Sequence, residues 1–505
     1  MAGPAALVNP PPVSHAPPHV IIIGGGVTGL SAAFYLDKLA RAANLPMHYT
    51  LIERDLRLGG KILTDRIEHP AHFIIEGGPD SFVAQKPWGV DLIRELGLED
   101  QLMGANEADR KTFILFNGKP YPMPDGLQLI VPTKFWPFVR SPLLSPLGKL
   151  RMLLDVLIPP KRDGADETLA DFVRRRFGTE ALDKFGEPLM SGIHSSEAER
   201  QSLLATFPRF RALEEKHGSL IRGMRAHRRS NSATKDRQDQ QLAGPAALSA
   251  QIATSPFLTL RAGVGTLIDA LAARLDGHLL TGREVHAIEH TPEADQRYRV
   301  ELDHGEVLAA DAVILATPAF VAADLVRPFQ PELAAELERM RYVSTATVTL
   351  AYRRRDIGEP LKGFGLIIPP SEQRRINACT MTSIKFAHRA PDEYTLVRVF
   401  VGGSRTPDSF SLDDVALLAL VRQELRAIVG IAAEPVWSRI YRWPQANPQY
   451  DVGHLDRLKT ITSLCPQGLY LSGSAYGGVG IPDCIRQGKE AATQALEQIA
   501  HVLSS

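Results

Sequence analysis

The chain has 505 residues, of which 44% are hydrophobic and 23% are charged, and this composition excludes a fibrous or a wholly disordered protein. Lysine plus arginine and aspartate plus glutamate both number 57, so nucleic-acid binding through bulk positive charge is excluded as well. The three cysteines form no CxxC pair, which excludes a disulfide scaffold or a cysteine-rich metal site and favours a reducing cytoplasm.

Two segments are predicted to lie outside the folded core. Residues 1–18 are rich in proline and contain neither Lys or Arg nor a long apolar run. A secretory signal needs both features, so we interpret this segment as a disordered tail. Residues 228–245 are polar and lack aromatic side chains, which is typical of a mobile surface loop.

The first structured segment predicts a dinucleotide-binding turn. His19–Ile23 is suited to a buried parallel strand, and the residues that follow satisfy the pattern GxGxxG before a predicted helix: Gly24, Gly25, Gly26, Val27, Thr28 and Gly29. Gly24 permits the tight turn, Gly26 lets a pyrophosphate approach the backbone, and Gly29 allows close helix–strand packing. A glycine-rich turn without a ligand is the alternative.

The next strand ends in an acid and is followed by a second glycine loop. Glu53 follows the predicted strand His48–Ile52, where a carboxylate binds the ribose hydroxyls of FAD or NAD rather than NADP. The segment Arg57–Lys61 (RLGGK) resembles the loop that flavin oxidases carry at this point, which favours FAD. An ordinary turn before the strand-like Ile62–Ile67 is the alternative.

The order of predicted elements indicates an α/β protein, α+β overall. Between residues 84 and 225 most segments predict helices, among them 196–204. Strands and a helix alternate from 257 to 322, and strands dominate from 342 to 403. This order predicts a nucleotide-binding domain that is interrupted by insertions.

The C-terminal segment predicts a strand, a glycine-rich turn and a helix. Leu469–Leu471 is the strand and Ile485–Ala495 the helix. The amides at the start of the helix are expected to face the flavin and to stabilise negative charge on its reduced form. A flexible glycine loop is the alternative, and Cys484 is expected to be a packed helix residue rather than a redox thiol.

Several segments together resemble the oxygen-dependent FAD porphyrinogen oxidases of haem biosynthesis, which comprise protoporphyrinogen and coproporphyrinogen III oxidases. The resemblance covers nearly the whole chain from residue 19 onward. The segments that carry it are EGGPDSF at Glu76–Phe82, EPLMSGI at Glu187–Ile193, ATFPRF at Ala205–Phe210, LRAGVGTL at Leu260–Leu267, ADAVILATP at Ala310–Pro318, RWPQANPQY at Arg442–Tyr450 and LYLSGSAYGGVGIPDCIRQGKEAA at Leu469–Ala492. The last is the most specific, whereas the first glycine turn is shared with amine oxidases and carotenoid desaturases.

The resemblance implies a Rossmann-type FAD-binding domain of the amine-oxidase-like superfamily, built from distant segments, with a strand-rich substrate domain and a helical insertion. The expected division is a tail at 1–18, FAD-binding segments at 19–83, 258–322 and 441–505, a helical insertion at 84–205, a connection at 206–257 that includes the loop, and a substrate domain at 323–440.

The implied activity is the oxidation of a porphyrinogen to the porphyrin in three two-electron steps. The flavin accepts the hydride, and O2 takes the electrons as hydrogen peroxide, so no catalytic side chain is assigned and no metal is expected. Coproporphyrinogen III and protoporphyrinogen IX both stay open as substrates. The alternatives are an amine oxidase or a carotenoid desaturase of the same fold, and a non-catalytic escort protein that has lost the flavin.

The resemblance also places the FAD contacts. Val285 is expected at the adenine end, and Trp443 near the ring or else as a structural tryptophan. The full predicted set is Gly24, Gly25, Gly26, Val27, Thr28, Gly29, Glu53, Arg54, Gly60, Lys61, Gly77, Gly78, Pro79, Asp80, Val285, Trp443, Gly473, Ser474, Val479, Gly480 and Ile481.

The substrate carries carboxylates, so an apolar pocket with bases at its edge is expected. Where the family places an arginine this chain has Thr112, and Arg110 and Lys111 beside it are the candidate bases, with solvated surface positions as the alternative. Asp80 is expected close to flavin and substrate. The residues expected to flank the macrocycle are Leu366, Ala378 and Phe386, with core packing as the alternative.

Residues 377–391 resemble the coproporphyrinogen branch, whose substrate has more acidic groups. Lys385, His388 and Arg389 are the bases expected to meet them. Lys134–Val139 and Lys149–Ile158 combine aromatic or apolar with basic residues, which predicts either a peripheral membrane contact or buried helices. A cytoplasmic protein that binds no nucleic acid is expected, and a homodimer stays open.

Overall fold

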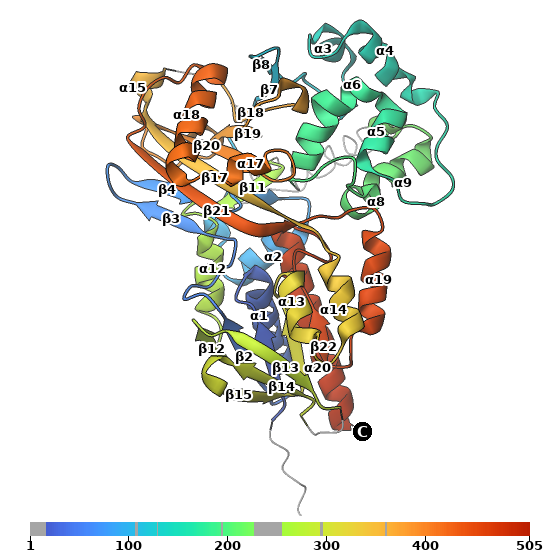
Figure 1. The fold of residues 1–505 in the computed structure, drawn as a ribbon, viewed down its shortest axis with the longest axis vertical. Coiled ribbons are helices and arrows are strands. Elements are labelled where there is room, and N and C mark those ends of the chain that lie inside the picture. Colours follow the sequence, from blue (N-terminus) through green and yellow to red (C-terminus); the bar gives the residue numbers. More distant parts are fainter. Residues whose placement is uncertain are drawn as a thin grey trace, which may run out of the picture.

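The computed structural model describes residues 17–106, 110–128, 130–192, 195–226, 255–292, 296–358 and 361–504. The predicted loop 228–245 and nearly all of the predicted tail 1–18 lie outside this part of the chain. Figure 1 shows a molecule of two halves, with a parallel sheet and its helices in the lower half. The upper half contains a larger sheet on one side and a group of helices on the other.

The lower half is built on a five-stranded parallel sheet in the order β12-β2-β1-β16-β22. Its strands are short and come from distant segments: β1 (His19–Ile23), β2 (His48–Glu53), β12 (His278–Thr281), β16 (Ala312–Leu315) and β22 (Leu469–Leu471). Ile21 on β1 lies beside both Thr50 and Val313. The sheet is apolar on both faces because each face is covered.

Helices cover both faces of this sheet. On one face α1 (Val27–Ala42), α12 (Gly265–Ala272) and α20 (Ile481–Ser504) pack on Val20 and Ile22. On the other face Ile21 and Ile23 pack against α13 (Ala319–Val326), α14 (Pro331–Glu338) and a three-stranded sheet of β13 (Val285–His290), β14 (Tyr298–Leu302) and β15 (Val307–Ala310). This is the α/β arrangement predicted for nucleotide binding.

The last helix begins earlier than predicted. We expected it from Ile485, but α20 starts at Ile481. Pro482 occupies its first turn, where a backbone N–H would have no partner within the helix, so the proline is tolerated there. The start of α20 therefore lies directly after the glycines of the C-terminal run.

The upper half contains a seven-stranded mixed sheet in the order β21-β17-β20-β19-β18-β7-β8. The strands are β7 (Thr112–Phe116), β8 (Lys119–Pro122), β17 (Tyr342–Arg353), β18 (Gly365–Ile367), β19 (Ala378–Met381), β20 (Tyr394–Gly402) and β21 (Trp437–Pro448). One face packs on α18 (Asp414–Val429) in an apolar core, and the other faces the loop that follows β4 (Phe73–Glu76).

The expected division of the chain differs from this arrangement at three places. The predicted helical insertion 84–205 contains β7 and β8, which join the large sheet through β18. Residues 323–341, assigned to the substrate domain, pack as α13 and α14 on the parallel sheet. Strand β21 crosses the predicted boundary at 441. Each difference comes from long-range pairing, which local patterns do not encode.

The helical part consists of short helices around their own apolar core. They include α3 (Phe135–Arg140), α4 (Pro146–Leu153), α5 (Leu169–Phe177), α8 (Leu203–Thr206), α9 (Pro208–His217) and a π-helix, η4 (Leu182–Ser191). The helix predicted at 196–204 is absent up to Ser202 and begins only with α8. No helix in the described part of the chain is long and apolar enough to cross a membrane.

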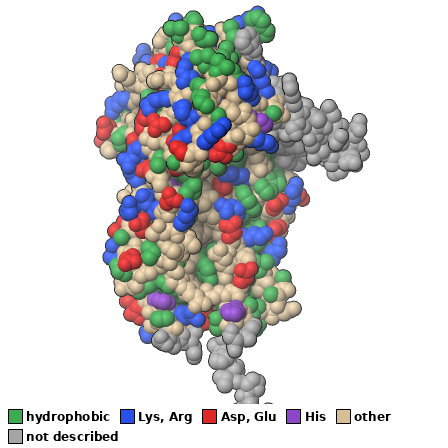
Figure 2. Space-filling view, turned by 90° about the vertical axis from the view of Figure 1, so that its right-hand side faces the viewer, with side chains coloured by type: hydrophobic (Ala, Val, Ile, Leu, Met, Phe, Trp, Pro, Cys, Tyr) green, Lys and Arg blue, Asp and Glu red, His purple; other side chains and the backbone are tan. Residues whose placement is uncertain are grey.

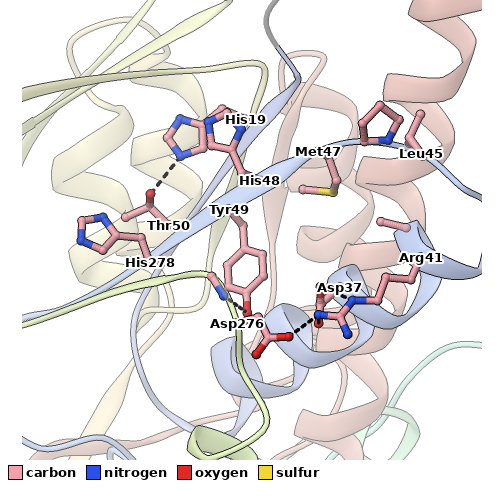
Figure 3. A pocket seen from close by; sticks show the side chains of 13 residues that line it. His19, Asp37, Arg41, Leu45, Met47, His48, Tyr49, Thr50, Asp276 and His278 are labelled. Atoms are coloured by element: carbon pink, nitrogen blue, oxygen red, sulfur yellow. Dashed lines mark hydrogen bonds and ion pairs between the residues drawn. The ribbon is translucent and has the colours of Figure 1, made fainter.

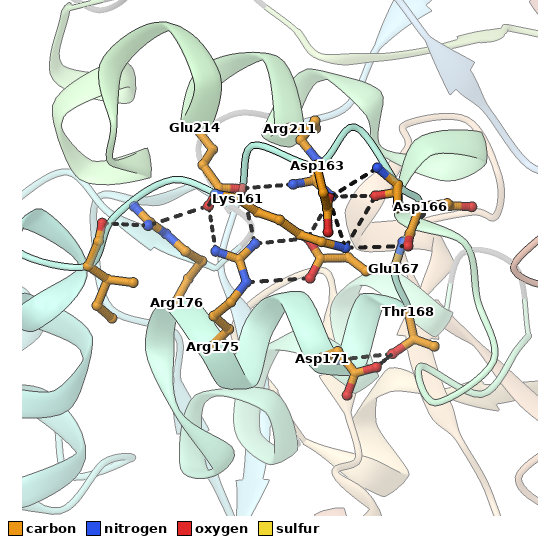
Figure 4. A network of polar contacts seen from close by, with 12 residues as sticks. Lys161, Asp163, Asp166, Glu167, Thr168, Asp171, Arg175, Arg176, Arg211 and Glu214 are labelled. Atoms are coloured by element: carbon orange, nitrogen blue, oxygen red, sulfur yellow. Dashed lines mark hydrogen bonds and ion pairs between the residues drawn. The ribbon is translucent and has the colours of Figure 1, made fainter.

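A buried ion network ties these helices together (Figure 4). Arg176 on α5 and Asp155 are both fully buried, with Nε and Oδ1 2.6 Å apart. Arg175 donates to Glu214 on α9 at 2.5 Å and to Glu167 at 2.8 Å. Because buried charges are stable only when paired, the network fixes how α5, α9 and residues 155–167 pack.

Candidate active site

The glycine turn lies at the carboxyl end of β1 and opens α1. Gly24 has a φ of +109°, and its N–H donates to the carbonyl of Ile52 at 2.8 Å. A Cβ on Gly29 would lie 1.9 Å from the carbonyl oxygen of Gly24, whereas a Cβ on Gly26 would meet no atom within 4 Å. Gly29 is therefore required by packing, and Gly26 leaves open space beside the start of the helix.

The start of α1 is free to bind an anion. Its cap residue Gly26 has no side chain to bond the first N–H groups, and the first turn contains no acidic residue. The carboxylate of Glu53 lies against the same turn, accepting from the N–H of Gly25 at 2.6 Å and of Asp55 at 2.9 Å. A phosphate site and an acid that accepts ribose hydroxyls thus lie side by side. Arg54 points outward beside Asp55.

The second glycine loop brings a lysine to this turn. Gly59 donates to the carbonyl of Gly25 at 2.8 Å, and the backbone of Gly60 lies against Gly26. The ammonium of Lys61 donates to the carbonyl of Ala446 at 2.7 Å and to Ser474 Oγ at 3.1 Å. Burial lowers the pKa of Lys61, yet its side chain has a large exposed fraction, so it lines an opening inside the molecule.

The C-terminal run closes the opposite side of this opening. Gly473 has a φ of +138°, and a Cβ there would come no closer than 4.0 Å to any neighbour. Tyr450 Oη donates to the carbonyl of Ser474 at 2.7 Å and accepts from the N–H of Gly478 at 2.9 Å. Val479, Gly480 and Ile481 then lead into α20. Two distant glycine segments thus surround one space.

The first turn of α20 contains an acid that we did not consider. Asp483 is buried and pairs with Lys86 at 2.5 Å. This lysine neutralises the carboxylate, so the positive end of the helix is preserved near Gly480. Cys484 is buried in the same turn, and burial raises the pKa of its thiol. A thiol of that kind stays protonated, as expected for a packed helix residue.

The loop Gly77–Asp80 joins the two halves of the molecule. The guanidinium of Arg398 on β20 donates to the carbonyl of Gly78 at 2.5 Å and of Gly77 at 3.3 Å. The indole N–H of Trp443 on β21 donates to the same Gly77 carbonyl at 2.9 Å. Trp443 therefore positions this loop, and the structure places the large sheet directly over the residues predicted to bind the flavin.

Two ion pairs reinforce this junction, one partly exposed and one fully buried. Asp80 lies 3.0 Å from the ammonium of Lys385, and Glu76 lies 3.3 Å from the guanidinium of Arg389. Burial alone would raise the pKa of Asp80, but Lys385 and Arg398 hold it well below its usual value. Asp80 is therefore ionised, and Lys385 already has an internal partner. Burial raises the pKa of Glu76, against the effect of Arg389.

Sequence reasoning missed Arg398, the cation at the centre of this network. It lies in the apolar run of β20 and is buried, and burial lowers its pKa. A charged residue in the middle of a predicted buried strand was the available signal, because such a charge needs a partner.

The predicted substrate residues do not all lie on one face of the large sheet. Strand register puts Ala378 beside Phe400 and Ile367, on the same face as Arg398 two residues along β20. Leu366 packs instead in the core beneath α18, on the opposite face. Alternation of side chains along a strand separates Leu366 from Ile367, and Ile367 was not predicted.

The remaining predicted residues lie at several places in the molecule. Phe386 is fully buried beneath Lys385, with the ammonium 4.8 Å from its ring centre. Arg110 and Lys111 are exposed just before β7. His388 is exposed and lies 3.2 Å from Arg261. Val285 begins β13 close to Glu53, because the N–H of Arg283 donates to the Glu53 carbonyl at 3.1 Å.

A separate hollow of about 630 Å³ lies at the amino ends of β1, β2 and β12 (Figure 3). Arg41 there pairs with Asp37 and Asp276, and His19 bonds Thr50 at 2.9 Å. Ligands of open α/β sheets bind at the carboxyl ends of the strands. This hollow is at the other edge, so we do not assign the cofactor to it.

A parallel sheet, a glycine turn with a free helix start, an acid at the end of β2 and two further glycine segments around one space define a dinucleotide-binding flavoprotein. The model of the family described as flavin containing amine oxidoreductase matches residues 27–496. The chain belongs to this family, and FAD is its cofactor. The start of α1 and Lys61 fit the pyrophosphate, and Glu53 fits a ribose.

Relatives of known name match over almost the full length. Coproporphyrinogen III oxidase of Bacillus subtilis (strain 168) is 37% identical, covering 95% of this chain and 98% of the relative. Chloroplastic protoporphyrinogen oxidase of Nicotiana tabacum is 29% identical, covering 94% and 84%. A crystal structure from Exiguobacterium sp. 255-15, whose name assigns it to the protoporphyrinogen oxidases, has a TM-score of 0.80 at 34% identity and covers 95% of this chain and 99% of that one.

Proposed function

We propose that the protein oxidises coproporphyrinogen III to coproporphyrin III with O2, as an FAD enzyme of haem biosynthesis. The observation that carries this proposal is the apolar face of Ile367, Ala378 and Phe400 beside the Gly77–Asp80 loop, with cations at its edge. Three relatives named coproporphyrinogen III oxidase are 32 to 37% identical to the chain, and the chloroplastic protoporphyrinogen oxidases are 28 to 30% identical. Protoporphyrinogen IX is the second candidate.

The reaction removes six electrons and six protons from the macrocycle in three equal steps. Bound FAD supplies the hydride acceptor in each step, and three O2 become three H2O2. The residues of the chain bind the macrocycle and orient it. Ile367, Ala378 and Phe400 provide an apolar surface that excludes water from the reacting bridge carbon, and the Arg398 network holds the Gly77–Asp80 loop against it.

The charges of this site favour an acidic substrate. Asp80 is matched by Lys385, and Glu76 by Arg389, which leaves Arg398 as an additional buried cation near the face. Lys111 adds an exposed cation just before β7 of the same sheet. An excess of positive charge beside an apolar surface suits a macrocycle with carboxylate substituents.

We also propose that the protein contacts a membrane surface peripherally from the cytoplasm. Four leucines at Leu147, Leu150, Leu154 and Leu157 are all exposed, and Leu147 is 78% exposed. Their spacing puts them on one helical face, and Trp136 on α3, 65% exposed, lies under the guanidinium of Arg140. Figure 2 shows apolar side chains at this end of the molecule. We call Trp136 and the four leucines the apolar stripe.

Whether the enzyme is a homodimer is tested by its mass in solution.

The proposed function is tested by offering the two anaerobically prepared porphyrinogens separately and following porphyrin fluorescence after O2 is admitted. We expect coproporphyrinogen III to be oxidised faster than it autoxidises and faster than protoporphyrinogen IX, with three H2O2 per porphyrin. Faster turnover of protoporphyrinogen IX would move the assignment to the second candidate. No acceleration of either substrate would contradict both.

A further inference from the structure

Arg405 lies in the turn that follows β20, three residues beyond Gly402, the last residue of the strand. Gly402 and Gly403 reverse the chain with φ values of +85° and +69°. The N–H of Ser404 donates to the carbonyl of Ser195 at 3.1 Å, and a Cβ on Gly403 would come within 2.9 Å of Ser195. The turn that carries Arg405 is therefore packed tightly against the helical part of the molecule.

The guanidinium of Arg405 is half-buried but unengaged. Within the part of the chain that the structure describes, it makes no hydrogen bond and no ion pair within 4.0 Å. The nearest opposing charges are Glu187 and Asp183 on the π-helix η4. Arginine has five N–H donors, and removing them from bulk water without acceptors costs free energy. A ligand carboxylate would supply these acceptors.

The strand that leads to Arg405 carries the face that we propose to bind the macrocycle. Arg398 and Phe400 alternate on the substrate face of β20, and the distance from Arg398 to Gly402 is about 13 Å at the usual rise per residue. Ile367 and Ala378 lie between these ends on neighbouring strands. This span is comparable to the width of a tetrapyrrole, and Arg405 follows it three residues beyond Gly402.

We propose that Arg405 binds a propionate carboxylate of the porphyrinogen and so determines specificity for the more acidic substrate. The inference rests on the proposed function. A planar guanidinium and a carboxylate pair through two parallel N–H···O bonds. Among the described residues no acceptor bonds the Arg405 guanidinium, so its N–H donors can engage a substrate carboxylate.

Measuring how tightly the protein binds the product tests the role of Arg405 in binding independently of the rate of oxidation. The dissociation constant of coproporphyrin III is measured by fluorescence quenching on the FAD-loaded protein. We expect Arg405→Gln to weaken binding about ten- to hundredfold and Arg405→Lys to weaken it less. The tetramethyl ester of coproporphyrin III, which lacks the charges, should bind wild type and Arg405→Gln equally. Arg355→Gln, whose side chain is 76% exposed on α15 (Arg354–Ile357), is the matched control and should behave as wild type.

The outcomes distinguish the two proposals. If wild type oxidises coproporphyrinogen III and Arg405→Gln binds the free acid as tightly as wild type, the carboxylate site is wrong and the function stands. An equal loss for acid and ester would also overturn the site. If wild type neither binds the acid nor oxidises either porphyrinogen, the proposed function fails. FAD content checks folding, and if Arg405→Gln does not retain FAD, Arg405→Lys is judged by the same comparison of acid and ester.

Discussion

Single residues in this protein act as charge partners across the junction of its two halves. Lys385 was predicted as a substrate base, and its ammonium lies against Asp80, which belongs to the flavin-side loop. Lys385 therefore has two effects that can be separated: it stabilises a buried carboxylate, and it contributes positive potential to the substrate face. Arg398 also has two effects. It donates hydrogen bonds to the Gly77 and Gly78 carbonyls, and it contributes positive potential to the same face.

Lys385→Ala should lower coproporphyrinogen III turnover more than protoporphyrinogen IX turnover, because the first substrate has more carboxylates to match. It should also lower the free energy of unfolding by about 2 kcal/mol, since the largely buried carboxylate of Asp80 loses its hydrogen-bonded cation. Turnover of both substrates and denaturant unfolding are the measurements. The double variant Asp80→Asn/Lys385→Ala should recover part of the stability but not the substrate preference. Equal losses on both substrates would contradict a role in specificity.

His454 should make stability depend on pH. It is buried and stacked on Tyr450, and burial lowers its pKa from 6.5 to about 4. Between these values the unfolded chain binds a proton that the folded chain does not, so stability is lost as pH falls from 6.5 towards 4. Over this range wild type should lose up to about 3 kcal/mol more unfolding free energy than His454→Gln. The exposed His304→Gln is the control, and parallel profiles for wild type and His454→Gln would contradict the assignment.

At the scale of elements, the glycine turn before α1 has two different roles. One glycine allows close packing, and another leaves space for a ligand. The start of α1 approaches β1 so closely that Gly29 cannot carry a side chain, whereas Gly26 faces open space three residues earlier. The same loop is held by Gly59 and Gly60 from the second glycine segment. These contacts order the free N–H groups of α1 before any ligand binds, which lowers the entropic cost of binding.

Gly26→Ala and Gly29→Ala should fail in different ways. The added methyl of Gly26→Ala enters the space assigned to the pyrophosphate, so we expect an apoprotein as stable as wild type with at least tenfold weaker FAD binding. In Gly29→Ala the methyl clashes with the Gly24 carbonyl, and we expect a loss of more than about 2 kcal/mol in unfolding free energy. FAD titration and thermal unfolding of the apoproteins test this. Normal FAD affinity in Gly26→Ala would argue against the assigned phosphate site.

At the scale of the whole molecule, the parallel sheet and the apolar stripe lie at opposite ends, and the predicted site lies between them (Figure 1). Side chains of both charge signs are interspersed over the face in Figure 2, in keeping with the zero net charge. The ion network reaches the apolar stripe at Asp155, which lies between Leu154 and Leu157 and pairs with Arg176. If the apolar stripe contacts a membrane, as we propose, a substrate that partitions towards lipid would enter the protein from the end that carries the stripe.

Replacing Leu147 and Leu157 with glutamine should reduce partitioning onto anionic lipid vesicles at least tenfold, because each buried leucine contributes about 1.5–3 kcal/mol. Co-sedimentation measures this, and oxidation of porphyrinogen in detergent should be unchanged. The control is Val415→Gln/Val502→Gln, which alters two exposed apolar residues away from the apolar stripe. Equal partitioning of both double variants and wild type would contradict membrane contact through the apolar stripe.

The sequence by itself determined the features that depend on neighbouring residues. The first glycine turn, the acid after β2, the second glycine loop and the alternation of helices and strands are local patterns, and the structure contains each of them. The early start of α20 was not predicted, although a proline is tolerated in the first turn of a helix. The predicted helix at 196–204 failed because those residues pair with distant segments, such as Gln201 with Asp451.

Only the tertiary structure decided which distant residues form the site. Charge balance and three cysteines excluded classes of protein but could not show that Lys385 meets Asp80, or that Arg398 holds the Gly77–Asp80 loop. Strand register placed Ile367 rather than Leu366 on the face that we propose to bind substrate, since adjacent residues of a strand point to opposite sides. Arg405 is a candidate because it is half-buried and makes no hydrogen bond with any residue that the structure describes. Burial and pairing between segments hundreds of residues apart are properties of packing, and local sequence patterns do not contain them.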